Sequence, residues 1–347
     1  GQGDGKVSRA GKFSYAARMA TVAVIGAGAI GAYYGGRLAL GGHDVRFLVR
    51  SDLAAWRERG LRVFSVDGDF SIARPACFGD ARELGVVDWV ICALKATAID
   101  EAPELIAPCV GPGTRIVALM NGLGNEQRLA ERFERWRIFG GMAFVGINRG
   151  EAGVVHHLAY GRVTIGHLED DRGACEELAG LLRSGGIDTV IAPNLRFARW
   201  EKLCWNVPFN GLSVAAGGVG TRMVVEDGEL RALAEGAMRE VVRVGNADLA
   251  EAGSSVRLVE DDVVARMFAQ TDAIGDYRTS MVIDYVLGRP LEVEAILGNP
   301  VRRARELGVG APRMEALYAL VRHADVVRRG MRRLLAPEDL ALPAKVV

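Results

Sequence analysis

The chain has 347 residues, half of them apolar and a quarter charged, and its 43 basic residues balance its 43 acidic ones. This balance gives no electrostatic footprint for a nucleic acid or an anionic membrane, and no apolar run reaches the roughly 20 residues of a membrane-spanning helix. The five cysteines are scattered without metal-ligand spacing, which predicts reduced thiols, no metal site and a cytoplasmic protein.

Residues 1–18 are polar and basic and lack the apolar core of a secretory signal. We therefore expect them to form a disordered extension ahead of a natural start at Met19. From residue 21 to 193, short apolar runs alternate with helical patterns. Predicted strands cover residues 21–26, 43–50, 87–94, 114–121 and 188–193, with antiparallel strands within 153–166. Predicted helices cover residues 29–41, 98–110 and 174–184. This rhythm is typical of a parallel sheet with helices on both faces, so residues 19–193 are predicted to form an α/β, Rossmann-type doubly wound domain.

After residue 194 the strand signals largely stop and helical periodicity takes over. Predicted helices cover residues 195–210, 227–252, 261–275, 280–287, 293–307 and 313–332. We therefore expect an all-α helical domain over residues 194–335, followed by a C-terminal tail at 336–347. The long helices are compatible with a homodimer, although apolar stripes of this kind more often pack within one chain.

A glycine-rich turn follows the first predicted strand. It reads Gly26, Ala27, Gly28, Ala29, Ile30 and Gly31, which is G-x-G-x-x-G between a strand and a helix. In this setting the glycines permit a tight turn, a close approach of the backbone to a pyrophosphate, and close packing of helix on strand. The turn therefore predicts a dinucleotide-binding domain, although a structural turn without a cofactor remains an alternative.

The end of the second strand indicates which dinucleotide is bound. An acidic residue there favours NAD, whereas a cation favours the 2′-phosphate of NADP. The strand ends with Arg50 and Ser51, which suit a phosphate, and Asp52 is the opposing sign in the loop that follows. We predict NADP, with a solvated surface arginine as the alternative reading of Arg50.

Lysine is rare in this chain, because 38 of the 43 basic residues are arginine. Only Lys95 and Lys202 lie within the expected folded region. Unlike arginine, a lysine can have its pKa lowered enough to exchange a proton. The two lysines are therefore candidates for a functional site.

Lys202, Asn206 and Asn210 are spaced four residues apart on a predicted helix whose other residues are mostly apolar. Each step of four advances about 40° around a helix, so the three side chains share a face. Buried amides need partners, and an oxygen-rich substrate would supply them. Burial would lower the pKa of Lys202 and make it a proton donor near neutral pH. A polar stripe facing water between the domains is the alternative.

Three further residues are weaker candidates. Asn121 ends a predicted strand at the carboxyl edge, where doubly wound sheets bind ligands. Ser280 and Glu292 stand at predicted helix starts, where a serine usually caps the helix and a glutamate usually complements its dipole. From the residues alone, Ser280 and Glu292 are more readily structural than functional.

These residues together resemble the ketopantoate reductase (2-dehydropantoate 2-reductase) family over about residues 20–325. The resemblance rests on GAGAIG at 26–31, Arg50, ALKA at 93–96, MNGLG at 120–124, the Lys-Asn-Asn spacing at 202–210, and the distal segment SMVIDYVLGRPLEVEAILG. It implies reduction of 2-dehydropantoate to pantoate with NADPH, in pantothenate and coenzyme A biosynthesis, in a cleft between a Rossmann domain and a helical domain.

The resemblance also implies roles for individual residues. Lys202 would be the general acid, with Asn206, Asn210 and Ser280 binding the substrate. Glu292 would lie near the substrate and the nicotinamide, Lys95 and Asn121 would contact the cofactor, and Arg50 would contact its 2′-phosphate.

Three positions depart from the pattern of some family members, which have glutamine at Ala98 and asparagine at Gly220 and Tyr277. These departures leave open a paralogous NADP-dependent reductase of another small 2-oxo acid. Apart from them, three further alternatives stay open. They are a related dehydrogenase of a hydroxy acid or an opine-like amino acid, a non-catalytic NADP-binding sensor, which would have no need to keep Lys202, and a helical dimerisation module with a vestigial Rossmann domain.

Overall fold

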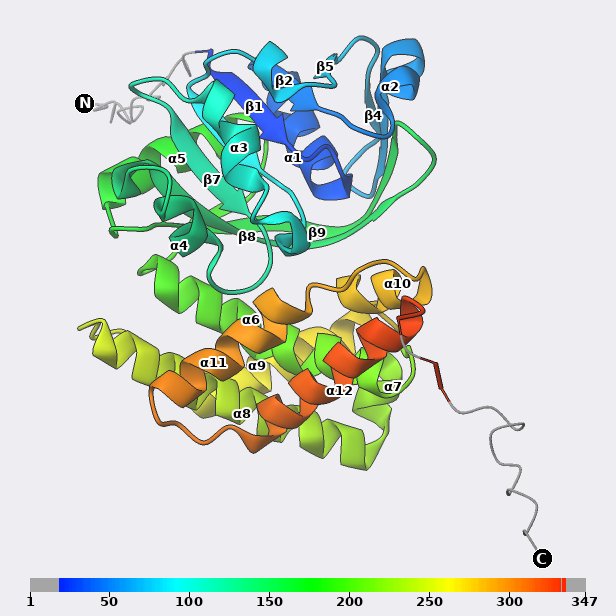
Figure 1. Cartoon of the computed structure of the whole chain (residues 1–347), viewed down its shortest axis with the longest axis vertical. Coiled ribbons are helices and arrows are strands. Elements are labelled where there is room, and N and C mark those ends of the chain that lie inside the picture. Colours follow the sequence, from blue (N-terminus) through cyan, green and yellow to red (C-terminus); the bar gives the residue numbers. More distant parts are fainter. Residues whose placement is uncertain (1–18, 332, 335–347) are drawn as a thin grey trace, which may run out of the picture.

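The computed structural model describes residues 19–331 and 333–334, so the expectations for residues 1–18 and 336–347 lie outside the described residues. A sheet domain with its helices comes first along the chain, and a helical layer follows it (Figure 1). The α/β domain followed by an all-α domain that the sequence predicts is thus confirmed.

Ten strands form one sheet, in the order β4-β3-β9-β8-β7-β6-β1-β2-β5, with β10 also pairing to β9. The strands are β1 (Thr21–Ile25), β2 (Asp44–Leu48), β3 (Leu61–Ser65), β4 (Phe70–Ile72), β5 (Ala76–Phe78), β6 (Trp89–Cys92), β7 (Arg115–Leu119), β8 (Ile138–Arg149), β9 (Val154–His167) and β10 (Thr189–Ile191). Strands β2, β1, β6, β7 and β8 are parallel, whereas β8 and β9 form an antiparallel pair.

The order of the strands reverses at β1, which pairs with β2 on one side and with β6 on the other. Helix α1 (Ala29–Leu40) starts directly after the carboxyl end of β1. In doubly wound sheets the crevice at this reversal is where ligands bind. The glycine turn at residues 26–31 therefore lies at the binding position of the fold.

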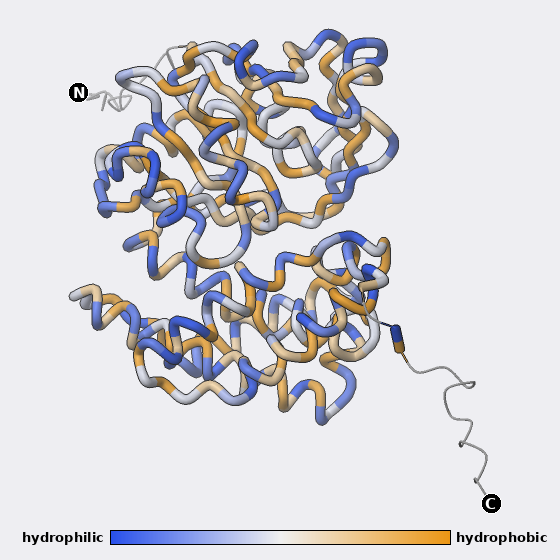
Figure 2. Tube along the Cα trace, viewed as in Figure 1, coloured by the Kyte–Doolittle hydropathy of each residue, from blue (hydrophilic) through white to orange (hydrophobic). Residues whose placement is uncertain are grey.

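Both faces of the central strands of the sheet are buried. Along β1, Val22 and Val24 pack into one apolar cluster, while Ala23 and Ile25 pack into another. Successive side chains on a strand point to opposite faces, so a strand covered on both sides must be apolar throughout. In the helical layer, hydrophobic and hydrophilic residues alternate along the tube, as in helices that bury one face (Figure 2).

Two expectations for the first domain are wrong in detail. The helix expected at residues 98–110 is broken into a 3-10 turn (Ala96–Ala98), α3 (Ala102–Ile106) and a second 3-10 turn (Ala107–Cys109). Pro103 and Pro108 lie inside that segment and cannot donate the backbone bonds that a continuous helix needs. The antiparallel strands expected within residues 153–166 are a single strand, β9, whose antiparallel partner is β8. The sequence does not predict strands β3, β4, β5 and β8. The remaining α-helices of this domain are α2 (Leu53–Arg59), α4 (Asn125–Ala130) and α5 (Arg172–Ser184), and two further 3-10 turns cover Ala81–Glu83 and Arg135–Arg137.

The second domain consists of packed helices. They are α6 (Leu195–Ala215), α7 (Thr221–Glu226), α8 (Gly228–Glu251), α9 (Glu260–Ile274), α10 (Ser280–Val286), a π-helical turn (Glu294–Gly298), α11 (Asn299–Glu306) and α12 (Pro312–Arg328). Helix α6 continues through Pro208, five residues beyond its predicted end. Over the described ranges, no helix combines the length and apolarity that a membrane span requires.

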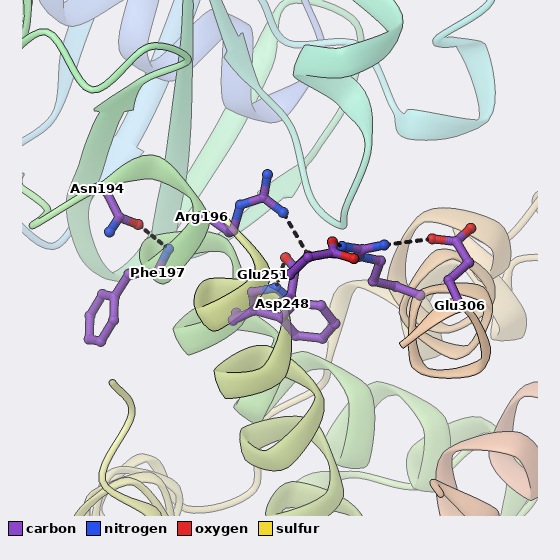
Figure 3. A network of polar contacts seen from close by, with 8 residues as sticks. Asn194, Arg196, Phe197, Asp248, Glu251 and Glu306 are labelled. Atoms are coloured by element: carbon purple, nitrogen blue, oxygen red, sulfur yellow. Dashed lines mark hydrogen bonds and ion pairs between the residues drawn. The ribbon is translucent and has the colours of Figure 1, made fainter. Parts of the chain in front are cut away.

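Helix α6 is held firmly at its start. The side chain of Asn194 caps it by accepting a hydrogen bond from the Phe197 amide at 2.7 Å (Figure 3). Close by, Arg196 forms an ion pair with the buried Asp248 of α8 at 2.6 Å (Figure 3). The cap satisfies a backbone amide at the start of the helix, and the ion pair lies within the helical domain.

Candidate active site

A cavity of about 480 Å³ lies between the sheet domain and the helical domain. Its wall comes from the turn after β1, the loop after β6, the end of β7, strand β8, helix α6 and the segment around α10. The polar residues that line it are Lys95, Thr97, Asn121, Asn148, Arg149, Lys202, Asn206, Tyr277, Ser280, Asp284, Arg289 and Glu292. Most of the predicted site residues are thus brought to one place.

The three glycines of the turn have different surroundings. A Cβ at Gly26, whose φ is +99°, would lie 2.9 Å from the carbonyl carbon of Ala93, and one at Gly31 would lie 2.1 Å from the carbonyl oxygen of Gly26. A Cβ at Gly28 would meet no atom within 4 Å. Two glycines therefore permit the turn itself, while Gly28 leaves an open approach to the backbone at the start of α1. This space, lined by Gly28, Ala29 and Ile30, suits a dinucleotide pyrophosphate.

Lys202 reaches the cavity from α6. Its Nζ lies 4.8 Å from the centroid of the Phe144 ring and 6.0 Å from that of Trp205. Among the described residues, no carboxylate oxygen lies within 4.0 Å of this ammonium group. Burial lowers the pKa of Lys202 to about 8. A lysine in this setting can give up a proton near neutral pH.

Asn206 and Asn210 follow Lys202 on the same helix but point to different places. Asn206 is buried and lines the cavity. Asn210 is not among the lining residues, because its Oδ1 accepts a hydrogen bond from the backbone amide of Met281 at 3.1 Å. Two steps of about 40° carry Asn210 roughly 80° away from Lys202, which is far enough to face α10 instead. Of the three residues expected to share one face, Lys202 and Asn206 thus line the cavity, whereas Asn210 binds the backbone at the start of α10.

Ser280 is the first residue of α10, but it is not the cap. The cap is Thr279, whose side chain accepts a hydrogen bond from the amide of Val282 at 3.2 Å. Ser280 is left exposed on the cavity wall with its hydroxyl available. The structural role that the sequence favoured for Ser280 is therefore filled by its neighbour.

Glu292, on the wall of the cavity, joins the two domains through hydrogen bonds. Its Oε1 accepts a hydrogen bond from the amide of Ala96 at 2.8 Å, and its Oε2 accepts one from Nδ2 of Asn121 at 3.4 Å. Burial raises the pKa of this carboxyl group, although both hydrogen bonds oppose the shift. Asn121 and Glu292, far apart in the sequence, thus form one part of the wall.

Lys95 forms an ion pair with Asp284, which lies on α10 and is almost fully buried. Arg289 lies 4.0 Å from the same carboxylate. Sequence reasoning missed Asp284. Its position four residues after Ser280 on the predicted helix, which puts both side chains on one face, is the signal that could have found it.

Arg50 lies outside this cavity. Its side chain is exposed and its Nη1 is 3.5 Å from the carboxylate of Glu101, beside a separate open hollow at the end of β2. Asp52, the opposing sign for cofactor choice, is paired with Arg149, a cavity residue from the end of β8 that sequence reasoning also missed. The carboxylate of Asp52 is therefore already neutralised by a cation.

All five cysteines are free and buried. Within the described residues, no group of three or more His, Cys, Asp or Glu side chains is arranged to hold a metal ion.

Comparisons with known proteins agree on one family. The family model described as ketopantoate reductase PanE/ApbA matches residues 22–170, and the model of its C-terminal part matches residues 194–325. A 2-dehydropantoate 2-reductase of Nostoc sp. (strain PCC 7120) is 38% identical, over 87% of this chain and 94% of the relative.

Solved structures give the same result. The 2-dehydropantoate 2-reductase of Geobacter metallireducens GS-15 has a TM-score of 0.84 and 42% identity, over 88% of this chain and 99% of that one. A D-mandelate dehydrogenase solved with NADH and anilino(oxo)acetate has a TM-score of 0.81 over 89% of this chain and 99% of that one. At 22% identity, that second likeness shows the fold alone.

Proposed function

The chain belongs to the ketopantoate reductase family of NAD(P)-dependent oxidoreductases that act on CH–OH groups, and from this premise we propose that it reduces 2-dehydropantoate to pantoate with NADPH. Lys202 is the general acid of this reaction. The named relatives, 38% and 42% identical over most of the chain, support the substrate.

One observation carries the proposal, namely the surroundings of the Lys202 ammonium group. Its ammonium faces the cavity beside aromatic rings and has no carboxylate partner within 4.0 Å among the described residues. A charge held this way is costly unless a ligand oxygen completes its surroundings. A ketone oxygen that gains negative charge supplies that partner, and the lowered pKa lets Lys202 pass its proton to this oxygen.

The other residues orient the substrate. A bound nicotinamide supplies the hydride. Asn206 and Ser280 offer neutral hydrogen-bonding groups for the carboxylate and hydroxyl of the substrate, from two different helices. Asn121 and Glu292 form the wall on the side of the glycine turn, where they would border both the substrate and the nicotinamide. Asn210 does not contact the substrate in this proposal. It accepts a hydrogen bond from the amide of Met281 and so holds the backbone next to Ser280.

The residues present also fit the cofactor. The open space at Gly28 suits the pyrophosphate, and Lys95 lies on the loop after β6 that borders it. The pairing of Asp52 with Arg149 occupies the acid that would bind an NAD ribose. Arg50 is paired with Glu101 only through a long, solvent-exposed contact of 3.5 Å, which a 2′-phosphate can replace. These two observations favour NADP over NAD.

A second candidate is the reduction of another small 2-oxo acid. Tyr277 lines the cavity, and its ring lies 6.0 Å from that of Trp205, whose indole nitrogen donates to Thr271 at 2.9 Å. This wall therefore presents mostly carbon to a substrate. A branched or aromatic 2-oxo acid without a distal hydroxyl fits the same description.

Steady-state rates test both candidates. Oxidation of NADPH and NADH is followed in parallel with ketopantoate, 2-oxoisovalerate and benzoylformate, and we expect the highest kcat/KM with NADPH and ketopantoate. Lys202→Ala should lower kcat by at least about 100-fold, since general acids contribute on that scale, and should leave NADPH binding nearly unchanged. Lys202→Arg should fail as well, because a guanidinium does not release its proton. Turnover near the wild-type rate in either variant would contradict the role of Lys202.

A further inference from the structure

Arg199 is buried between the two domains, three residues before Lys202 on α6. Its Nε donates to Oε1 of Glu126 at 3.0 Å, and its Nη2 forms an ion pair with the same oxygen. Both side chains are at most 3% exposed. A buried charge pair of this kind is retained only when its hydrogen bonds are satisfied, so its remaining contacts matter.

The other donors of Arg199 reach the backbone of the sheet. Nη2 donates to the carbonyl of Ala118 at 3.0 Å, and Nη1 donates to the carbonyl of Met120. These carbonyls lie at the carboxyl end of β7, directly before Asn121 on the cavity wall. One guanidinium therefore joins the helix of Lys202 to the strand end that carries Asn121.

The local packing is shaped around this ion pair. A Cβ at Gly140 of β8 would lie 2.4 Å from Oε1 of Glu126 and 3.2 Å from Nη2 of Arg199. The pair thus rests directly on the backbone of a second strand, which leaves it little freedom to shift.

We propose that Arg199 is a positioning residue, which sets the distance between the Lys202 ammonium and the strand end at Asn121. This inference rests on the proposed function, in which Lys202 protonates a ketone held between these elements. Displacing a reacting group by about 1 Å can cost about 100-fold in rate, so a rigid link at this point has a direct effect on turnover.

The test compares substitutions of two arginines on the same helix. Arg199→Met removes the link to the sheet. Arg196→Met is the matched control, because Arg196 pairs with Asp248 inside the helical domain (Figure 3), and Asp248 keeps Trp200 and Arg303 as partners at 2.7 Å each. We expect kcat with ketopantoate to fall by about 100-fold in Arg199→Met and by less than about 3-fold in Arg196→Met, with the Kd of NADPH nearly unchanged in both.

Two further variants separate positioning from folding. Arg199→Lys keeps the charge, but its donors lie on a single nitrogen atom and cannot span Glu126 and both carbonyls as the guanidinium fork does. The variant should therefore fold and still lose kcat. The double variant Arg199→Met/Glu126→Leu replaces the pair with apolar groups, which should restore thermal stability without restoring kcat. The alkaline limb of the kcat/KM profile should also move to higher pH in the Arg199 variants, as water reaches Lys202.

The outcomes are distinct. A kcat near that of the wild type in the folded Arg199→Lys variant, or a double variant that regains stability and turnover together, would overturn the positioning role. Wild-type protein that does not reduce ketopantoate would contradict the proposed function instead.

Discussion

At the scale of single residues, the energetic cost of burying the Lys202 ammonium group is measurable in the free energy of unfolding. Its pKa in the folded chain is about 8, below the ordinary lysine value of 10.5, because burial disfavours the charged form. Between these two values the unfolded chain binds more protons, so stability rises with pH over this window. Below about pH 8 the folded chain therefore bears the full penalty of the buried charge.

Lys202→Met removes this penalty. At pH 7 we expect the variant to be more stable than the wild type by up to about 3 kcal/mol, and we expect the difference to shrink between about pH 8 and 10.5. Urea unfolding at pH 7 and at pH 10 measures it. A variant that is less stable than the wild type at both values would show that the lysine is not a buried charge.

The sequence predicts some site residues better than others, for physical reasons. Lys202 and Asn206 follow from spacing alone, because a helix brings residues four apart to one face. The pairing of Arg149 with Asp52 joins residues on β8 and after β2, so no local pattern could indicate it. The cap at Thr279 rather than Ser280 depends on where α10 begins, which sequence patterns locate only to within a residue or two.

At the scale of elements, two glycines of the turn are expected to have different roles. Gly31 is needed for folding, and Gly28 is needed for binding the cofactor. Gly31→Ala places a Cβ against the carbonyl oxygen of Gly26 and should destabilise the fold by about 1–3 kcal/mol. Gly28→Ala meets no protein atom and has an ordinary φ of −73°, so its stability should stay within about 0.5 kcal/mol of the wild type. The same variant should bind NADPH at least about 10-fold more weakly, because its methyl group would occupy the space left for the pyrophosphate. Thermal melts and NADPH titration check the contrast, and unchanged binding in Gly28→Ala would exclude the turn as the pyrophosphate site.

Elements with a strong apolar signal were predictable, and those that depend on their neighbours were not. β1, β6 and β7 are apolar almost throughout because they are buried on both faces. β8 contains Gly140, Gly141 and Gly146, which weaken its intrinsic strand preference, and its pairing with β7 and β9 overrides that preference.

At the scale of the whole molecule, the ion pair of Lys95 with Asp284 joins the two domains at the rim of the cavity. Asp284→Ala should weaken closure of the domains over the substrate, so the KM for ketopantoate should rise several-fold while the Kd of NADPH changes little. Asp272→Ala is the control, since Asp272 pairs with Arg231 on the surface of the helical domain. Equal KM values for the two variants would show that the junction does not depend on this pair.

The homodimer expected from the long helices stays a prediction.

The scarcity of lysine has a practical consequence. Lys95 and Lys202 are the only lysines in the described ranges, and both line the cavity. Selective carbon-13 enrichment of lysine side chains would therefore give at most five Cε resonances in the whole chain, two of them from the place where the chemistry is proposed. Arginine remains silent in such a spectrum, so the protonation of the proposed acid can be followed directly by nuclear magnetic resonance as substrate and cofactor are added.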